Sequence, residues 1–306
     1  MLDWEEAWRS ALYGPSGFFV RGERPSGHFR TAPLIGQELA SALLSLLDRV
    51  DHALGRPPVV DFVDMGAGGG ELSAAVRELA SGSLSRRLRV TGVDLAPDPS
   101  LPGVRWTSSL EPSVGLLVAH EWLDAIPCPV VQGPSDDPWL ARWWPLGEGE
   151  WAEVGAPRDA AWASAVASVT GAALAIDYGH TADCRRPTLT GYRDGRQVAP
   201  VFDGSCDITA HVAFDSAAAA AGGSSVLVSQ RDALSALGLT ASVTDSDPMA
   251  WLEETARAGR IAELRAVGGL GDFGWLLHAT GPVRVSDLLP PLPAWRPNPA
   301  SFPTTD

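Results

Sequence analysis

A chain of 306 residues is long enough to bury a core of its own, and 45% hydrophobic residues is ordinary for a globular protein. The formal net charge of −14, with no lysine in the sequence, argues against a nucleic-acid-binding or anionic-membrane-binding surface and suits a cationic partner. No apolar run is long enough to span a bilayer, and three scattered cysteines form neither a metal site nor a disulfide framework, which favours the cytoplasm.

The first 55 residues are expected to form a lid and a helix. A short helix is predicted from Asp3 to Leu12, because Asp3 can cap it and Gly14 can end it. A loop rich in Gly and Pro follows, and its Thr31 is expected to close over a bound cofactor. Leucines near helical period then predict a long helix from Leu34 to Leu54.

A glycine turn follows the first predicted strand, an apolar run that ends at Val63. Glycines let a backbone turn tightly and approach a ligand closely, and strand–turn–helix is how an open α/β sheet forms a nucleotide pocket. The pattern is D-x-G-x-G-x-G, which resembles the first motif of class I methyltransferases, and Glu71 breaks the dinucleotide pattern G-x-G-x-x-G. A glycine turn without ligand is the alternative. The cofactor-binding residues predicted here are Asp64, Gly66, Ala67, Gly68 and Gly70.

The second strand is predicted from Leu88 to Leu95. Asp94 lies near its carboxyl end, where a carboxylate can accept both ribose hydroxyls of a nucleoside, and Leu95 is predicted to bind the cofactor beside it. The alternative for Asp94 is a solvated residue at a strand end.

A third group of candidates follows the buried-type strand Val114 to Ala119. Ligands of such sheets bind outside the carboxyl ends of the strands, so Glu121, Asp124 and His120 are the catalytic candidates. Asp124 could instead be a helix cap or turn residue, and His120 a hydrogen-bonded structural residue.

The remaining strands predict an α/β fold, a Rossmann-like class I methyltransferase domain over residues 1–281 with a mostly parallel seven-stranded sheet. Residues 128–155 hold four tryptophans and are predicted to be an inserted β-hairpin, whose tryptophans form a small satellite core rather than a ligand site. A helix broken near Gly259 is expected between Asp247 and Ala266. The proline-rich tail, residues 282–306, is expected to be extended over the surface or disordered. Later strands are predicted at Ala172–Ile176, Ser225–Gln230 and Phe273–Thr280.

Taken in order, these stretches resemble the MidA-like methyltransferases, a family that includes a mitochondrial complex I assembly factor. The family patterns G-D-F-x-T-A-P, N-E-F-F-D-A-L-P, I-D-Y-G and D-L-T-A-H-V-D-F are similar to residues 27–33, 120–127, 176–179 and 207–214. This sequence departs from the family patterns at four positions: it has His120 where the family has Asn, Asp94 where it has Glu, Leu34 where it has an acidic residue and His28 where it has Asp. The resemblance implies an S-adenosylmethionine cofactor and methylation of arginine in a protein substrate.

In that reading, Glu121 orients and localises the charge of the guanidinium, Asp124 supports it, and His120 is a possible general base. A homodimer is possible, and neither a metal nor a nucleic-acid nor a membrane partner is expected. Two other functions stay open: a small-molecule methyltransferase, and a non-catalytic assembly factor that retains the fold. A nicotinamide dehydrogenase is the weakest option because of the glycine spacing.

Overall fold

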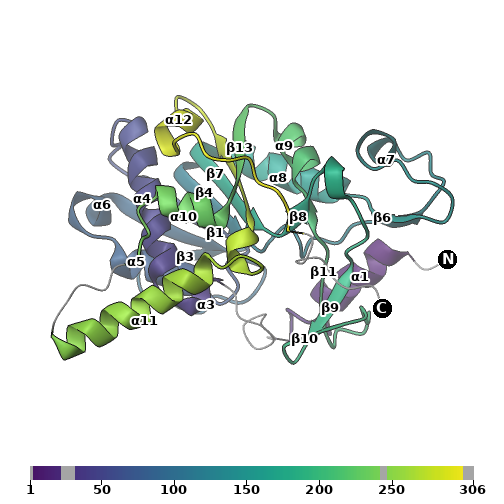
Figure 1. Ribbon diagram of the computed structural model, residues 1–306, viewed down its shortest axis with the longest axis horizontal. Helices are drawn as coiled ribbons and strands as arrows, with labels where there is room; N and C mark the ends of the chain where they lie inside the picture. The colour runs from purple at the N-terminus through teal and green to yellow at the C-terminus, as the bar shows by residue number, and fades with distance from the viewer. Residues whose placement is uncertain (1–2, 22–31, 242–246, 299–306) are drawn as a thin grey trace.

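The computed structural model describes residues 3–21, 32–241 and 247–298. Its centre is a seven-stranded sheet in the order β13-β14-β7-β4-β1-β2-β3 (Figure 1). The strands are β1 (Val60–Met65), β2 (Leu88–Val93), β3 (Val104–Thr107), β4 (Ser113–His120), β7 (Val169–Asp177), β13 (Ser224–Ser229) and β14 (Gly274–Ala279). Strand β14 is antiparallel to both neighbours and the other pairs are parallel, so the predicted α/β fold and its mostly parallel sheet are confirmed.

Alternate side chains of the central strands face two helical layers, as the period of two in a strand requires. Phe62, Leu116 and Leu174 belong to a core with α4 (Glu38–Ala53), α5 (Glu71–Leu79) and α10 (Gln230–Ala236). Val63, Leu117 and Ala173 belong to a second core with α8 (Ala156–Ser168) and α9 (Phe214–Ala221). Both faces of the sheet are therefore covered, and ligand chemistry is left to the edges where the strands end.

The predicted helix over residues 34–54 is interrupted, which corrects its boundaries. The structure has α3 (Ala32–Ile35) and then α4, with a break at Gly36 and Gln37. A Cβ at Gly36 would lie 2.4 Å from Glu38 Oε2 and 2.7 Å from Arg260 Cδ. The break therefore leaves room for Arg260 to donate to Glu38 at 2.7 Å. The first helix, α1 (Trp4–Tyr13), is capped by the Asp3 side chain and ends at Gly14, as predicted.

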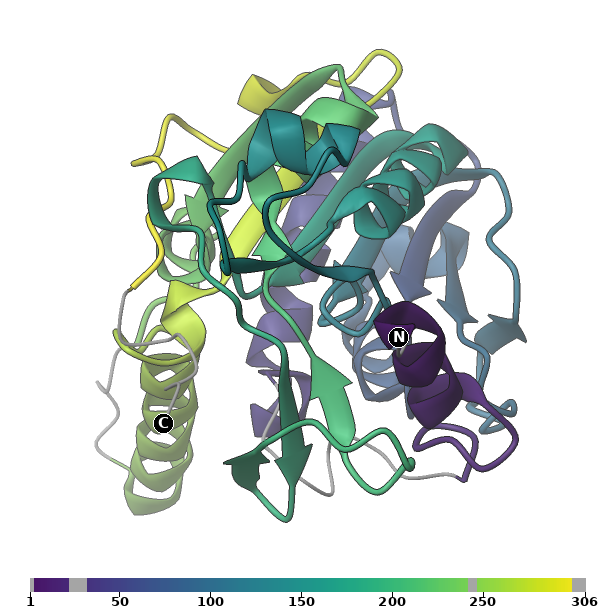
Figure 2. The ribbon, with the colours of Figure 1, turned by 90° about the vertical axis from the view of Figure 1, so that its right-hand side faces the viewer.

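The insertion between β4 and β7 is longer than a hairpin turn. Strands β5 (Val130–Gln132) and β6 (Trp151–Glu153) pair in antiparallel fashion, but α7 (Pro138–Trp143) lies between them. A second insertion carries a three-stranded sheet in the order β10-β9-β11. Its strands are β9 (Thr190–Arg193), β10 (Arg196–Val198) and β11 (Asp207–Thr209), and short pieces nearby are β8 (Gly179–His180), β12 (Val212–Ala213) and η1 (Ala182–Cys184). Helix α1 lies beside this small sheet, as Figure 2 shows.

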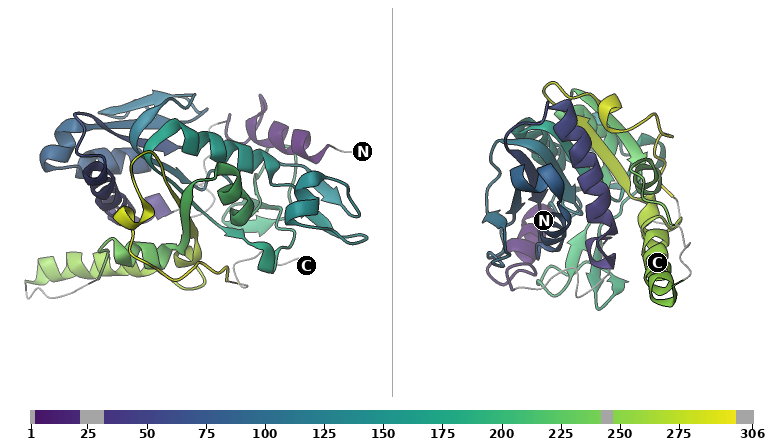
Figure 3. Two further views of the ribbon diagram at one scale, coloured as in Figure 1. Left: turned by 90° about the horizontal axis from the view of Figure 1, so that it is seen from above. Right: turned by 90° about the vertical axis from the view of Figure 1, so that its left-hand side faces the viewer.

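Two predictions for the last third of the chain need correction. Helix α11 (Pro248–Leu264) runs through Gly259 without a break and extends away from the body, at the end opposite α1 (Figure 3). The tail is irregular and mostly exposed over residues 290–298, as predicted, but it is anchored to the core, since α12 (Val285–Leu288) buries Leu288 and the chain beyond it buries Trp295. Trp295 donates its indole N–H to Asp272 O at 2.8 Å. The remaining short helices are α6 (Gly82–Arg87) and η2 (Leu270–Asp272).

Candidate functional site

The glycine turn after β1 has the conformation that its sequence predicts. Gly66, Gly68 and Gly70 have φ of 73°, 58° and 79°, values that side chains disfavour. A Cβ at Gly66 would lie 2.7 Å from Trp122 Cδ1, whereas a Cβ at Gly68 would meet nothing within 4 Å. The Ala67 N–H bonds Val93 O at 3.2 Å, which ties the turn to the end of β2. Gly66 therefore allows close packing, and Gly68 leaves open space where a ligand can approach.

The two acids predicted beside this turn have different surroundings. Asp64 is buried and accepts from Ser73 Oγ at 2.8 Å, so it anchors the turn to the first residues of α5. Burial raises the pKa of Asp64 to about 7. Asp94 is partly exposed and accepts from the Gly68 N–H at 2.8 Å and from the Ala96 N–H at 2.7 Å. Because each carboxylate oxygen has two lone pairs, Asp94 still has acceptor sites for hydroxyl groups.

No contact in the structure supports the cofactor-binding roles predicted for Leu95 and Thr31. Leu95 follows Asp94 with 72% of its side chain exposed. Thr31, placed in the expected lid, lies outside the described residues.

The loop directly after β4 forms the second half of the site, beside the glycine turn, and Glu121 is its first residue. Its φ of 49° is left-handed, a conformation that costs free energy in a residue other than glycine and that is often found at functional sites. Its N–H bonds Ile176 O on β7 at 2.9 Å, which fixes the turn against the neighbouring strand. Trp122, the next residue, packs on Gly66. The glycine turn and the loop carrying Glu121 are thus in direct contact.

Asp124 is only 2% exposed and lies against the end of β7. Its N–H bonds Asp177 Oδ2 at 3.2 Å, and the Tyr178 N–H bonds Asp177 Oδ1 at 2.9 Å. The Tyr178 side chain lies near Glu121 and Asp124 and partly offsets the burial that raises the pKa of each carboxyl. The structure therefore brings together two predicted catalytic residues, Glu121 and Asp124, and adds Asp177 and Tyr178.

A fourth carboxylate comes from β11. Asp207 is 2% exposed, and its charge lies close enough to Asp124 that repulsion between the two raises the pKa of Asp207. Burial contributes more, and together they raise the pKa of Asp207 to about 8. Burial is also the largest cause that raises the pKa of Glu121 and of Asp177 well above the ordinary values, followed by repulsion from neighbouring carboxylates. We call Glu121, Asp124, Asp177 and Asp207 the carboxylate cluster.

Arg158 on α8 joins the loop after β4, which carries Asp124, to the segment that follows β11. It is 2% exposed, and its guanidinium donates only to backbone oxygens in the described contacts. The acceptors are Asp124 O at 2.6 Å, Ile126 O at 3.0 Å, Ala210 O at 2.7 Å and His211 O at 3.0 Å. The Ala210 N–H also bonds Asp124 O at 3.2 Å. The position of β11 relative to Asp124 is therefore fixed by several hydrogen bonds.

Helix α1 covers the junction between the two halves of the site. The Tyr13 hydroxyl donates to Ala125 O at 3.1 Å. Burial first, and then the charges of Asp207, Asp124 and Asp94, raise the pKa of Tyr13. Tyr13 therefore lies near both the ribose candidate and the carboxylate cluster, as a lid residue would.

His120 has different chemistry from that expected. Its proposed use as a general base depended on a pKa near neutrality, but burial lowers the pKa of His120 to about 4. The imidazole is therefore neutral at pH 7, with Nδ1 at 3.4 Å from Glu121 Oε1. In this state His120 suits an orienting contact with Glu121 better than proton uptake.

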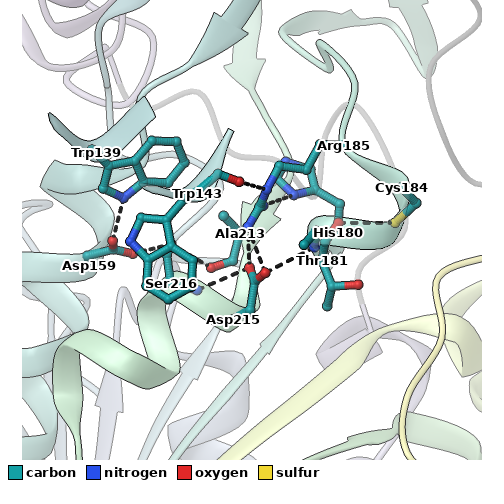
Figure 4. Close-up of polar contacts among 11 residues, drawn as sticks. Trp139, Trp143, Asp159, His180, Thr181, Cys184, Arg185, Ala213, Asp215 and Ser216 are labelled. Carbon is teal, nitrogen blue, oxygen red and sulfur yellow. Dashed lines mark hydrogen bonds and ion pairs between the residues drawn. The ribbon is translucent and has the colours of Figure 1, made fainter. Parts of the chain in front are cut away.

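The tryptophan-rich insertion forms a satellite core, as the sequence predicts, from three of its four tryptophans, whereas Trp151 is exposed. Trp139 and Trp144 are buried with Leu140 and Val154. Figure 4 shows how this insertion is joined to its surroundings: the Trp139 indole donates to Asp159 of α8 at 2.7 Å, and Arg185, in the chain after Tyr178, donates to Trp143 O at 2.5 Å. These contacts support the segment that follows the site and add no ligand group to it.

Sequence reasoning assigned no role to Asp177, Tyr178, Asp207, Tyr13 and Arg158. The first three lie in the I-D-Y-G and D-I-T-A-H-V segments, which served only to identify the family resemblance and were given no role in the site. An acid directly after a buried strand could have singled out Asp177, since that is the argument that found Asp94 and Glu121.

Among the residues that the structure describes, no group of three or more His, Cys, Asp or Glu side chains could hold a metal ion. Within the same ranges, no helix is long and apolar enough to cross a membrane.

Comparisons with known proteins agree on the fold. A family model described as "Putative S-adenosyl-L-methionine-dependent methyltransferase" matches residues 141–231. A Burkholderia thailandensis protein solved with S-adenosyl-homocysteine is similar over 90% of this chain and 87% of its own, with 24% identity and a TM-score of 0.74. A native structure of an uncharacterized protein from the same organism covers 94% and 90%, with 24% identity and a TM-score of 0.77. No curated protein matches the chain.

Proposed function

We propose that this chain is an S-adenosylmethionine-dependent methyltransferase that transfers a methyl group to a guanidinium nitrogen of arginine in a protein substrate. The observation that carries the proposal is the carboxylate cluster beside the glycine turn, at the carboxyl edge of a methyltransferase-type sheet. The matched family model and the S-adenosyl-homocysteine in a structure of the same fold support the cofactor. The MidA-like motifs support the arginine substrate.

The residues of the turn fit the cofactor. The space beside Gly68 and the remaining acceptor sites of Asp94 suit a nucleoside, whose ribose hydroxyls would donate to that carboxylate. S-adenosylmethionine supplies a methyl carbon activated by a sulfonium leaving group. The protein has to bind the nucleophile, align it and exclude water.

The carboxylate cluster suits a guanidinium substrate for two reasons. Glu121 and Asp124 offer oxygens that can accept the N–H groups of a planar cation in bidentate fashion, which orients it and localises its charge. Burial and repulsion raise the pKa of Glu121 and of Asp207, so the ionised forms that a bound cation would stabilise are stronger bases than exposed carboxylates. One proton must leave the nitrogen during methylation, and the cluster can accept it.

Transfer of a radiolabelled methyl group tests this function. The protein is incubated with labelled S-adenosylmethionine and a cell extract, and the labelled protein band is hydrolysed for amino-acid analysis. We expect label in methylarginine with the wild-type chain and none with Glu121→Gln, which keeps the shape but removes the charge. Label only in low-mass material would point to a small-molecule substrate. No label, with the cofactor still bound, would point to a non-catalytic assembly factor.

A further inference from the structure

Asp207 has the position and surroundings of a ligand-binding residue rather than a structural one. It begins β11 opposite Tyr192 of β9 and is 2% exposed. Among the described residues, its Oδ1 has no hydrogen-bond partner, and neither have Asp124 Oδ1 and Glu121 Oε1. Buried carboxylate oxygens are normally satisfied, because leaving them without a donor costs free energy. Three unsatisfied oxygens in one cluster indicate that a donor from outside the chain completes it.

The contacts around Asp207 fix it in place without satisfying it. The next residue, Ile208, accepts from the Trp8 indole at 3.0 Å, and Ala210 bonds the backbone of Asp124 at 3.2 Å. Arg158, a buried cation beside the cluster, uses its guanidinium on backbone oxygens from both loops. The Asp207 side chain is thus held near Asp124, while its carboxyl group has no ion pair among these contacts.

The balance of charge indicates the kind of donor. Four buried or nearly buried carboxyl groups lie near a single buried arginine, so burial and mutual repulsion oppose their ionising together unless a further cation joins them. The described residues contain no group that could hold a metal ion. A flat organic cation with several N–H donors, such as a guanidinium, can reach oxygens from more than one side.

We propose that Asp207 is a specificity-determining residue of the methyl-acceptor site: together with Asp124 and Glu121 it contacts the substrate cation and selects it over a neutral molecule of the same shape. The inference rests on the proposed function and deepens it. It adds a carboxylate from β11 to those supplied by the loop after β4, so the small sheet β9–β11 becomes one wall of the acceptor site.

The test compares two probes that differ in charge but hardly in shape. Acetyl-arginine amide and acetyl-citrulline amide are titrated by calorimetry into the full chain saturated with S-adenosylhomocysteine. We expect the wild-type chain to prefer the arginine probe, and Asp207→Asn to lower that preference about tenfold or more. The Asp207 carboxyl can release its proton to solvent when a cation binds, whereas an amide cannot become an anion. Asp203→Asn is the control, since it removes an exposed charge four residues away.

The measured ratio separates a binding role from a structural one. A variant that loses packing would bind both probes and S-adenosylhomocysteine more weakly. A variant that loses only the cation contact would change the ratio of the two probe affinities and nothing else. If Asp207→Asn does not fold, Asp207→Ser tests the same charge with a smaller side chain. An unchanged ratio in a folded variant, or no preference in the wild-type chain, overturns the inference. Failure of the wild-type chain to bind S-adenosylhomocysteine would instead contradict the proposed function.

Discussion

The buried guanidinium of Arg158 offers the sharpest test of how the acceptor site is held together. Arg158→Met keeps an unbranched apolar stem but removes every donor to Asp124 O, Ile126 O, Ala210 O and His211 O. Asp124 O retains its bond from Ala210, so three carbonyl oxygens lose the donor described here. At about 1–3 kcal/mol for each unsatisfied group, the loss is about 3–9 kcal/mol. Removing a buried charge returns several kcal/mol of desolvation, so we expect a net loss of about 3–5 kcal/mol.

Equilibrium unfolding in urea measures this loss, with Arg9→Met as the control. Arg9 pairs with Glu5 at the surface at 2.6 Å, and such a pair contributes about 0–1 kcal/mol. Arg158→Met should weaken binding of the arginine probe more than binding of S-adenosylhomocysteine. The variant loosens the loops that carry the carboxylate cluster but leaves the glycine turn unchanged. A free energy of unfolding within about 1 kcal/mol of the control would refute the clamp that we assign to Arg158.

Three further predictions follow from single features. Gly66→Ala should weaken S-adenosylhomocysteine binding about tenfold or more in a calorimetric titration, because its Cβ would lie 2.7 Å from Trp122. Gly222→Ala is the control: Gly222 has a similar φ of 64° but no neighbour within 4 Å of a Cβ, so this variant should bind S-adenosylhomocysteine as the wild-type chain does. Trp295→Ala should lower the free energy of unfolding by about 3–5 kcal/mol in urea, and a loss below about 1 kcal/mol would place the tail outside the core. The stability that the buried Asp207 contributes should fall as the pH rises from about 4 to about 8, because the unfolded Asp207 has released its proton in this window while the folded one, with its pKa raised to about 8, has not. In urea unfolding at several pH values, the difference in stability between the wild-type chain and Asp207→Asn should therefore change in this direction, and a constant difference would contradict the buried acid.

The sheet and the glycine turn could be predicted because their signals are local. Strands alternate with helices, and the turn needs three glycines at fixed spacing, which the φ angles of Gly66, Gly68 and Gly70 confirm. The same local logic predicted Glu121 and Asp124 at the end of a buried strand, and the structure brings them together beside the glycine turn.

Errors arose where tertiary contacts decide the outcome. Proline content predicted a tail over the surface, which residues 290–298 form, but it gave no sign that Leu288 and Trp295 are buried against the sheet core. Helical period suggested one helix through Gly36, yet the side chain of Arg260, more than two hundred residues away, occupies the space at the break. Asp207 lies 86 residues after Glu121 in the sequence, and only the packing of β11 on the loop after β4 shows that they share a site.

The central claim is that the glycine turn and Asp94 hold S-adenosylmethionine. Titration of the full chain with S-adenosylhomocysteine tests it most directly, with Asp94→Ala measured beside the wild-type chain. We predict saturable binding to the wild-type chain and clearly weaker binding to Asp94→Ala, because the variant loses the acceptor for the ribose hydroxyls and the bond to the Gly68 N–H. No binding to a folded wild-type chain, or equal binding by the two proteins, would contradict it.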